Sequence, residues 1–88
     1  MNIELIHLQD PGHGWLICPA SLVTSLGLAN QISRYSYLSR VSGEAYLEED
    51  CDAPLFLRAL KAAGWNPIIK EVHTPTDAKC RALPRFGA

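Results

Sequence analysis

The sequence predicts an α+β domain, in which an antiparallel sheet of about four to five strands carries two helices packed on one face. Short runs of aliphatic and aromatic residues alternate with clusters of turn residues, which is typical of strands. Two further apolar stretches have helical spacing and end at glycine. Because 88 residues suffice for one hydrophobic core only, we expect a single domain over 1–88, with 75–88 as an irregular tail.

A hairpin is expected at the start of the chain. The run "NIELIHL" (residues 2–8) is rich in aliphatic side chains and partly alternating, which favours a strand. The segment "DPGHG" (residues 10–14) combines proline and glycine in the manner of a turn. The run "WLIC" (residues 15–18) is then expected to pair back on the first strand.

A short helix of about two turns is expected next, because proline is tolerated in a first turn. Pro19 marks its beginning, and Leu22 and Leu26 would share one face of it. Gly27 is expected at its end, where glycine accepts the left-handed conformation.

The segment 32–50 predicts a second hairpin, since "ISRYSYLSRV" and "EAYLEED" flank a turn at Ser42 and Gly43. A two-residue loop would set Val41 opposite Glu44 and pair Leu38 with Leu47. One face of this hairpin would carry Tyr35, Tyr37, Val41, Glu44, Tyr46 and Glu48. The other face would carry Arg34, Ser36, Leu38, Arg40, Ala45, Leu47 and Glu49. Which face is buried stays open at this stage.

The second helix is expected to begin at Asp52, a residue that favours the N-cap position, with Pro54 in the first turn. The residues that would form its core-facing side are Phe56, Ala59, Leu60 and Ala63. A last strand is expected over 68–73, and the tail that follows has little periodicity.

Composition and cysteine spacing argue against several classes of protein. The net charge of −1 and the dispersed cations make direct nucleic-acid binding unfavourable. No apolar run reaches membrane-spanning length and the first residues do not resemble a signal peptide, so we expect a protein of the host cytoplasm with no membrane partner. Three widely spaced cysteines and three single histidines predict neither a disulfide framework nor a metal site.

Catalysis is not expected either. Cys18 or Cys51 could be combined with His13 and Asp10 into a nucleophilic triad, but Cys18 is better explained as a core residue. Neighbouring carboxylates would suppress the thiolate of Cys51. The sequence therefore predicts a protein that is not an enzyme and needs no cofactor.

The feature that remains is an acidic run beside aromatic residues. Five of the nine carboxylates lie between residues 44 and 52, and three tyrosines are interleaved nearby. If exposed, such a mixed surface suits a cationic partner, because charge steers the encounter and rigid rings supply contact area. The predicted partner-binding residues are Glu44, Glu48, Glu49, Asp50, Asp52, Tyr35, Tyr37 and Tyr46.

The strings "HGWL", "LGLANQISRYSY", "AYLEEDCDAPLF" and "LPRF" resemble a family of small accessory proteins carried by phages, plasmids and other mobile elements. The resemblance covers residues 13–86. Similar small proteins with acidic patches from the same genomic setting include anti-CRISPR inhibitors. The resemblance thus implies an inhibitor that binds a type I surveillance complex (Cascade) at its basic DNA-binding groove and blocks DNA binding.

Two other classes of function stay open. A nucleic-acid-binding accessory protein would use the cations Arg34, Arg40, Lys79, Arg81 and Arg85. A small enzyme or a module that neutralises another protein, such as a toxin, would show a thiol-dependent activity or one tight partner. Dimerisation through an unpaired edge strand or through the tyrosine face is also left open.

Overall fold

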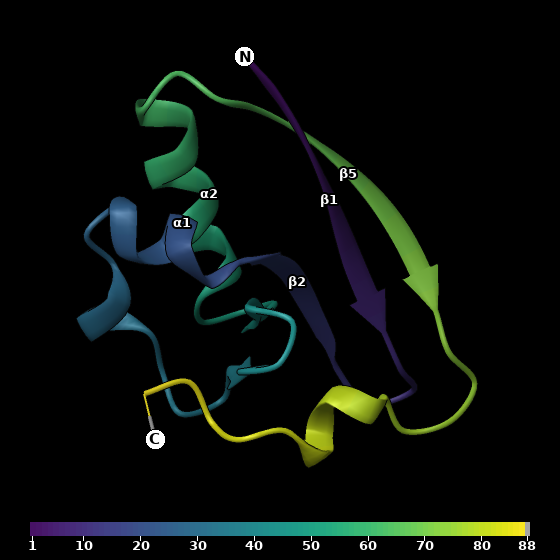
Figure 1. Cartoon of the computed structure of the whole chain (residues 1–88). Coiled ribbons are helices and arrows are strands. Elements are labelled where there is room, and N and C mark those ends of the chain that lie inside the picture. Colours follow the sequence, from purple (N-terminus) through teal and green to yellow (C-terminus); the bar gives the residue numbers. More distant parts are fainter. Residues whose placement is uncertain (88) are drawn as a thin grey trace.

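The computed structural model describes residues 1–87 and contains one five-stranded sheet with two α-helices (Figure 1). The elements run in the order β1 (Asn2–Gln9), β2 (Gly14–Pro19), α1 (Ala20–Ser25), β3 (Tyr37–Leu38), β4 (Glu44–Glu48), α2 (Ala53–Ala62) and β5 (Asn66–His73). Two short 3₁₀ helices, η1 (Ala29–Gln31) and η2 (Lys79–Ala82), complete the set. The α+β class expected from the sequence is confirmed.

The sheet is mixed rather than wholly antiparallel. Its strand order is β3-β4-β2-β1-β5, and all neighbours are antiparallel except β1 and β5, which run parallel. The connection through α2 carries the chain past β2 and β1 to the far edge and returns it to the end where β1 begins. There the N–H of Asn66 donates to the carbonyl of Met1 at 2.7 Å.

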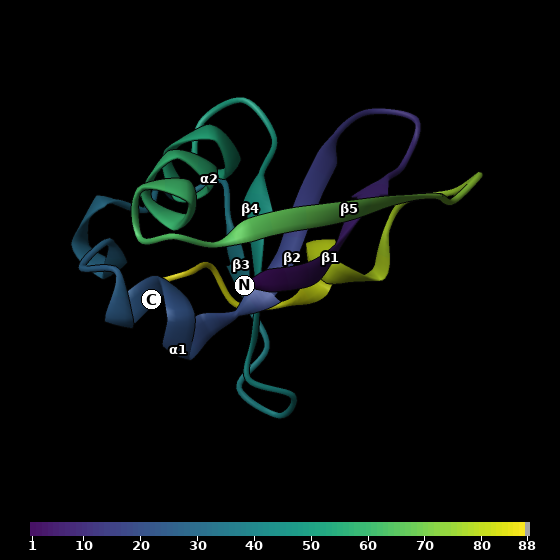
Figure 2. The same cartoon turned by 90° about the horizontal axis from the view of Figure 1, so that it is seen from above.

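The main core lies between the sheet and the two helices, which occupy the same side of β1, β2 and β5 in both views (Figures 1 and 2). Leu16 and Leu47 project from β2 and β4 and meet Val23 of α1 and Phe56 and Leu60 of α2. All five side chains are at most 1% exposed. The expected core residues Phe56 and Leu60 of α2 are therefore confirmed, and Ala59 packs against them, whereas Ala63 follows the end of the helix and is exposed.

The opposite face of the sheet carries a second, smaller core. Trp15 and Tyr37 pack there against Ala78 and Cys80 of the C-terminal segment. This segment, yellow in Figure 1, crosses the end of the sheet where β1 ends and β2 begins. Both faces of the central strands are thus covered, and the tail is irregular apart from η2 but packed.

The first hairpin agrees with its prediction: β1 pairs with β2, and His7 lies opposite Leu16. The first helix also agrees, because α1 begins directly after Pro19, and Gly27 has a φ of 75°. Residue 27 thus occupies the left-handed region that favours glycine.

The second hairpin was expected to be longer and to have a different register. In the structure β3 has only two residues, and Tyr37 pairs with Tyr46, two positions away from the predicted pairing. The loop is longer than two residues because the N–H of Gly43 donates to the carbonyl of Ser39 at 2.9 Å. A shift by two keeps the side chains of β3 and β4 on their expected faces, since strand side chains alternate with period two.

The residues before β3 leave the sheet because a buried carboxylate binds them. Asp52, 2% exposed, accepts hydrogen bonds from the N–H of Ser33 at 3.0 Å and its hydroxyl at 2.7 Å. The hydroxyl of Ser36 donates to the same carboxylate. Asp52 occupies the N-cap position of α2 as expected, but its side chain does not cap the helix, which corrects that prediction.

Candidate functional site

One corner of the molecule gathers chemically versatile side chains from four parts of the chain. It lies where the loop between β1 and β2 meets the end of β4, because Trp15 pairs with Glu48 and the N–H of Glu49 donates to the carbonyl of Gly14 at 3.0 Å. A pocket of about 210 Å³ opens there. It is lined by His13, Trp15, Tyr35, Tyr37, Glu48, Arg81 and Arg85.

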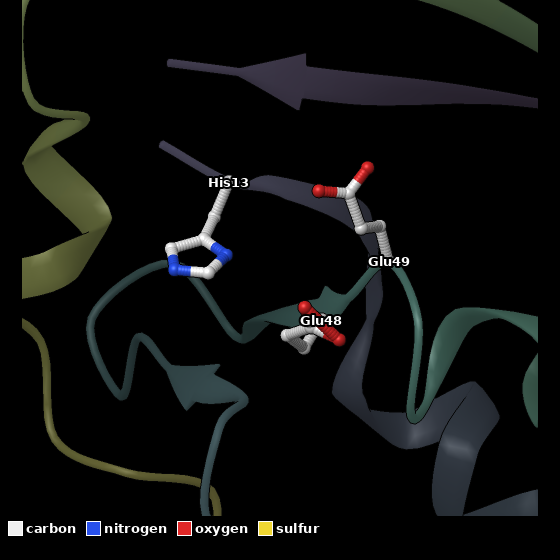
Figure 3. A group of neighbouring side chains, drawn as sticks. All are labelled: His13, Glu48 and Glu49. Atoms are coloured by element: carbon white, nitrogen blue, oxygen red, sulfur yellow. The ribbon is translucent and has the colours of Figure 1, made fainter. Parts of the chain in front are cut away.

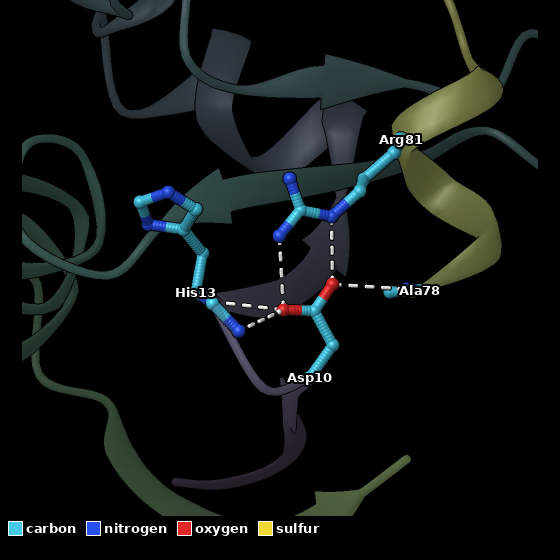
Figure 4. Close-up of polar contacts among 5 residues, drawn as sticks. Asp10, His13, Ala78 and Arg81 are labelled. Carbon is cyan, nitrogen blue, oxygen red and sulfur yellow. Dashed lines mark hydrogen bonds and ion pairs between the residues drawn. The ribbon is translucent and has the colours of Figure 1, made fainter. Parts of the chain in front are cut away.

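Asp10 holds one side of this corner together (Figure 4). Its side chain is fully buried and accepts the N–H groups of Gly12 and His13, both at 2.9 Å, and that of Ala78 at 2.9 Å. The guanidinium of Arg81 donates to both carboxylate oxygens, at 2.7 and 3.0 Å. Arg81, with further help from these N–H groups, holds the pKa of Asp10 well below its usual range. Asp10 therefore fixes His13 and Arg81 relative to each other.

Glu48 is a second buried carboxylate of the corner, at 8% exposure. Its Oε1 accepts the N–H groups of Asp50 at 2.7 Å and Cys51 at 2.9 Å, which closes the turn before α2. The N–H of Glu48 donates to the hydroxyl oxygen of Ser36 at 2.9 Å. These bonds fix the carboxylate and use only one of its two oxygens.

Glu48 and Glu49 lie near the imidazole of His13 (Figure 3), and His13 and Glu48 also line the pocket. One ligand atom from each of the three side chains lies within 4.8 Å of the other two. His13 and Glu49 are more exposed than Glu48, so the group opens toward solvent. A carboxylate pair beside an imidazole is a donor set suited to a divalent cation.

The opposite wall of the pocket consists of aromatic rings stacked with arginine. The ring centroids of Trp15 and Tyr37 lie 6.1 Å apart, Arg81 lies 5.1 Å from the Trp15 centroid, and Arg85 lies 5.0 Å from that of Tyr37. Trp15 is 2% exposed, and its Nε1 has no hydrogen-bond partner within residues 1–87. The pocket thus joins an anionic rim to a cationic, aromatic wall.

The structure divides the predicted partner-binding residues by exposure rather than placing them on one open face. Tyr37, Glu48 and Asp52 are buried. Tyr46 and Glu49 are intermediate, and Glu44, Tyr35 and Asp50 are exposed. Glu44 lies at the far end of β4 from the pocket. The members that the pocket brings together are Tyr35, Tyr37 and Glu48, with Glu49 and Asp50 beside them.

Sequence reasoning missed His13, Trp15, Arg81 and Arg85 as parts of the site. His13 was placed in a turn and considered only for a triad, Trp15 was placed in the second strand, and the two arginines were named only for the nucleic-acid-binding alternative. The one local signal was "GHGW", in which a histidine and a tryptophan flank a glycine. It does not reveal that the C-terminal segment returns to the same place.

The cysteines do not offer an activated nucleophile. Burial raises the pKa of Cys18 to about 12 and that of Cys80 to about 11. Cys51 is exposed, and partial desolvation together with Glu48 and its acidic neighbours raises its pKa as well. All three thiols therefore favour the protonated form, which is the weak nucleophile.

Comparisons with known protein families, with curated protein sequences and with solved structures find no match for the chain. Neither helix of the described residues has the length and apolar character that crossing a membrane requires.

Proposed function

We propose that the chain is a binding protein of a mobile genetic element that docks on a cationic surface of a host macromolecular complex. The complex that the sequence resemblance suggests is a type I surveillance complex, whose basic DNA-binding groove would be blocked. The observation that carries the proposal is the position of Tyr35, which is 47% exposed over the same pocket that Glu48 lines.

The corner supplies the two components of a mixed interface. Glu49 and Asp50 present carboxylates at its rim, and such charge accelerates encounter with a cationic groove. Tyr35 supplies a rigid ring that can be desolvated at low entropic cost. A net charge of −1 is too small for an electrostatic decoy of DNA, so contact area must contribute alongside charge.

The cations near the corner are engaged in contacts of their own. Arg81 is paired with Asp10, and Arg85 stacks on Tyr37 and donates to the carbonyl of Arg34 at 2.7 Å. Arg34 lies 5.3 Å from the centroid of the Tyr35 ring and donates to the Tyr35 hydroxyl at 3.4 Å, so a partner would meet this ring together with one cation. Glu49 and Asp50 follow Glu48 directly in the chain, and Asp50 is exposed.

Copurification tests the proposal directly. A tagged chain is expressed in cells that contain a type I system, and the retained Cas subunits are identified and quantified. The variant Tyr35→Ser/Asp50→Lys removes one exposed ring and reverses one rim charge. The control Val41→Ser/Glu4→Lys makes the matched changes at exposed positions outside the pocket lining.

We expect the wild-type chain and the control to retain the complex and the corner variant to lose it, with all three folded by circular dichroism. Retention of nucleic acid in place of a Cas complex, with salt-dependent affinity, would instead support the basic surface around Arg34 and Arg85. Equal capture by the corner variant and the control would refute docking at this corner.

A further inference from the structure

We propose that His13, Glu48 and Glu49 bind one divalent transition-metal ion, with Zn²⁺ as the probe of choice, at the mouth of the pocket. Imidazole nitrogen and carboxylate oxygen are ordinary ligands of this class of ion. The sequence did not suggest such a site, because the histidine and the two glutamates are separated by more than thirty residues. This inference does not depend on the proposed docking function.

The three donors already converge. Their ligand atoms lie within 4.8 Å of one another. Metal–ligand bonds of about 2.0–2.2 Å place neighbouring ligand atoms roughly 3–3.6 Å apart in a tetrahedral site. Closing the site therefore requires side-chain movements on the order of 1 Å, which rotamer adjustments of the more exposed His13 and Glu49 can supply.

Each donor is held by the fold rather than by chance exposure. The backbone N–H of His13 is fixed by Asp10. Oε1 of Glu48 accepts two backbone N–H groups, and these bonds leave Oε2 available to a ligand. Glu49 is anchored by its N–H to Gly14. Positioning of ligands by an outer layer of hydrogen bonds is characteristic of metal sites.

A second observation comes from Gly14, directly beside these donors. Its backbone does not have a positive φ, so conformation does not require glycine there. A Cβ at this position would lie 3.0 Å from Oε1 of Glu49 and 3.0 Å from both Cε1 and Nε2 of His7, so these side-chain ends would have to shift by a few tenths of an ångström. The missing side chain allows a carboxylate oxygen and an imidazole edge to share one small volume.

His7 strengthens this assignment. Its Nδ1 lies 2.7 Å from Oε2 of Glu71, so a proton on Nδ1 leaves the lone pair of Nε2 facing the volume shared with Glu49. His7 thus places an imidazole edge beside the carboxylate of Glu49, outside the group of three donors.

The open coordination positions would face the pocket. Three protein ligands leave at least one position for water or another oxygen ligand. Arg81 and Arg85 line the same pocket as His13 and Glu48, and the buried Nε1–H of Trp15 has no partner among the described residues.

The test is calorimetric titration of Zn²⁺ into chelator-treated protein in a buffer free of phosphate. All proteins carry Cys51→Ser, which removes the exposed thiol as an adventitious ligand. We expect about one equivalent of tight binding and a rise in Tm, because a ligand specific to the folded state stabilises it. The variants His13→Ala and Glu49→Gln should each raise the Kd for Zn²⁺ by about tenfold or more.

His73→Ala serves as the matched control, since His73 is exposed and lies outside the cluster. It should bind Zn²⁺ as the Cys51→Ser protein does. Gly14→Ala keeps all three ligand residues, but its Cβ would crowd Oε1 of Glu49 and should weaken binding. No saturable binding at 1:1, or binding that His73→Ala abolishes and Glu49→Gln leaves unchanged, would overturn the proposal.

Discussion

The core between the sheet and α2 can be tested by truncating Phe56. Its side chain is fully buried and packs in the main cluster with Leu16, Leu47 and Leu60. Loss of a buried aromatic side chain forfeits its transfer free energy, about 1.5–3 kcal/mol. The unfilled cavity adds to this, so Phe56→Ala should lower the free energy of unfolding by about 3–5 kcal/mol.

That loss is large for a chain of this size. At roughly 0.05–0.15 kcal/mol per residue, the whole domain is stable by about 4–13 kcal/mol. Each kcal/mol corresponds to about 4–8 °C in Tm for a small domain, so a decrease on the order of 12–40 °C is expected. Urea denaturation and calorimetry measure both quantities. The control Arg58→Ala, exposed on the same helix, should stay within about 0.5 kcal/mol of wild type. If Phe56→Ala lowers the free energy of unfolding by less than about 1 kcal/mol, the core described here is misplaced.

Three further predictions concern the corner and the thiols. The folded-state pKa of Asp10 lies well below its unfolded value of about 3.9. The contribution of ionised Asp10 to the stability of the fold is therefore fully present above about pH 4 and is lost as the pH falls further. The variant Asp10→Asn should accordingly lower Tm at pH 7 and make Tm fall less steeply with decreasing pH in the acid range. When native protein is treated at pH 8 with a chromogenic disulfide reagent, Cys51 alone should react, and slowly. Cys18 and Cys80 should react only in denaturant, because both are buried. Rapid labelling of all three thiols in the native protein would contradict their burial. Gly14→Ala should fold but shift the NMR signals of its cross-strand neighbours, and an unchanged spectrum would contradict the close contacts at this glycine.

Local sequence patterns predicted several elements of the fold correctly. The first hairpin follows from an alternating run, a proline–glycine turn and a second apolar run, all within twenty residues. The core face of α2 follows from helical spacing alone. In these elements the interactions that decide the structure lie within a few residues of one another, so periodicity is sufficient to find them.

The structure differs from the sequence-based prediction where contacts between residues distant in the chain determine the conformation. Residues 33–36 leave the sheet because Asp52, between 16 and 19 positions later, binds Ser33 and Ser36. The parallel pairing of β1 with β5 depends on where α2 returns the chain, which no local pattern records.

The candidate site escaped prediction for the same reason. Its two sides are joined by the contact between Asp10 and Arg81, which are 71 positions apart. The acidic run was recognised, but the structure uses Glu48 and Asp52 internally and leaves Glu49 and Asp50 at the rim. Partner binding by the exposed members stays a prediction for the copurification experiment.

The central claim is that the corner formed by the β1–β2 loop and the end of β4 holds a ligand. The most direct measurement is a crystal structure of the zinc-soaked protein with anomalous data collected at the zinc edge. The account predicts an anomalous peak at about 2.0–2.2 Å from one donor atom each of His13, Glu48 and Glu49. Ordered zinc bound only elsewhere, with these three side chains unligated, would contradict it.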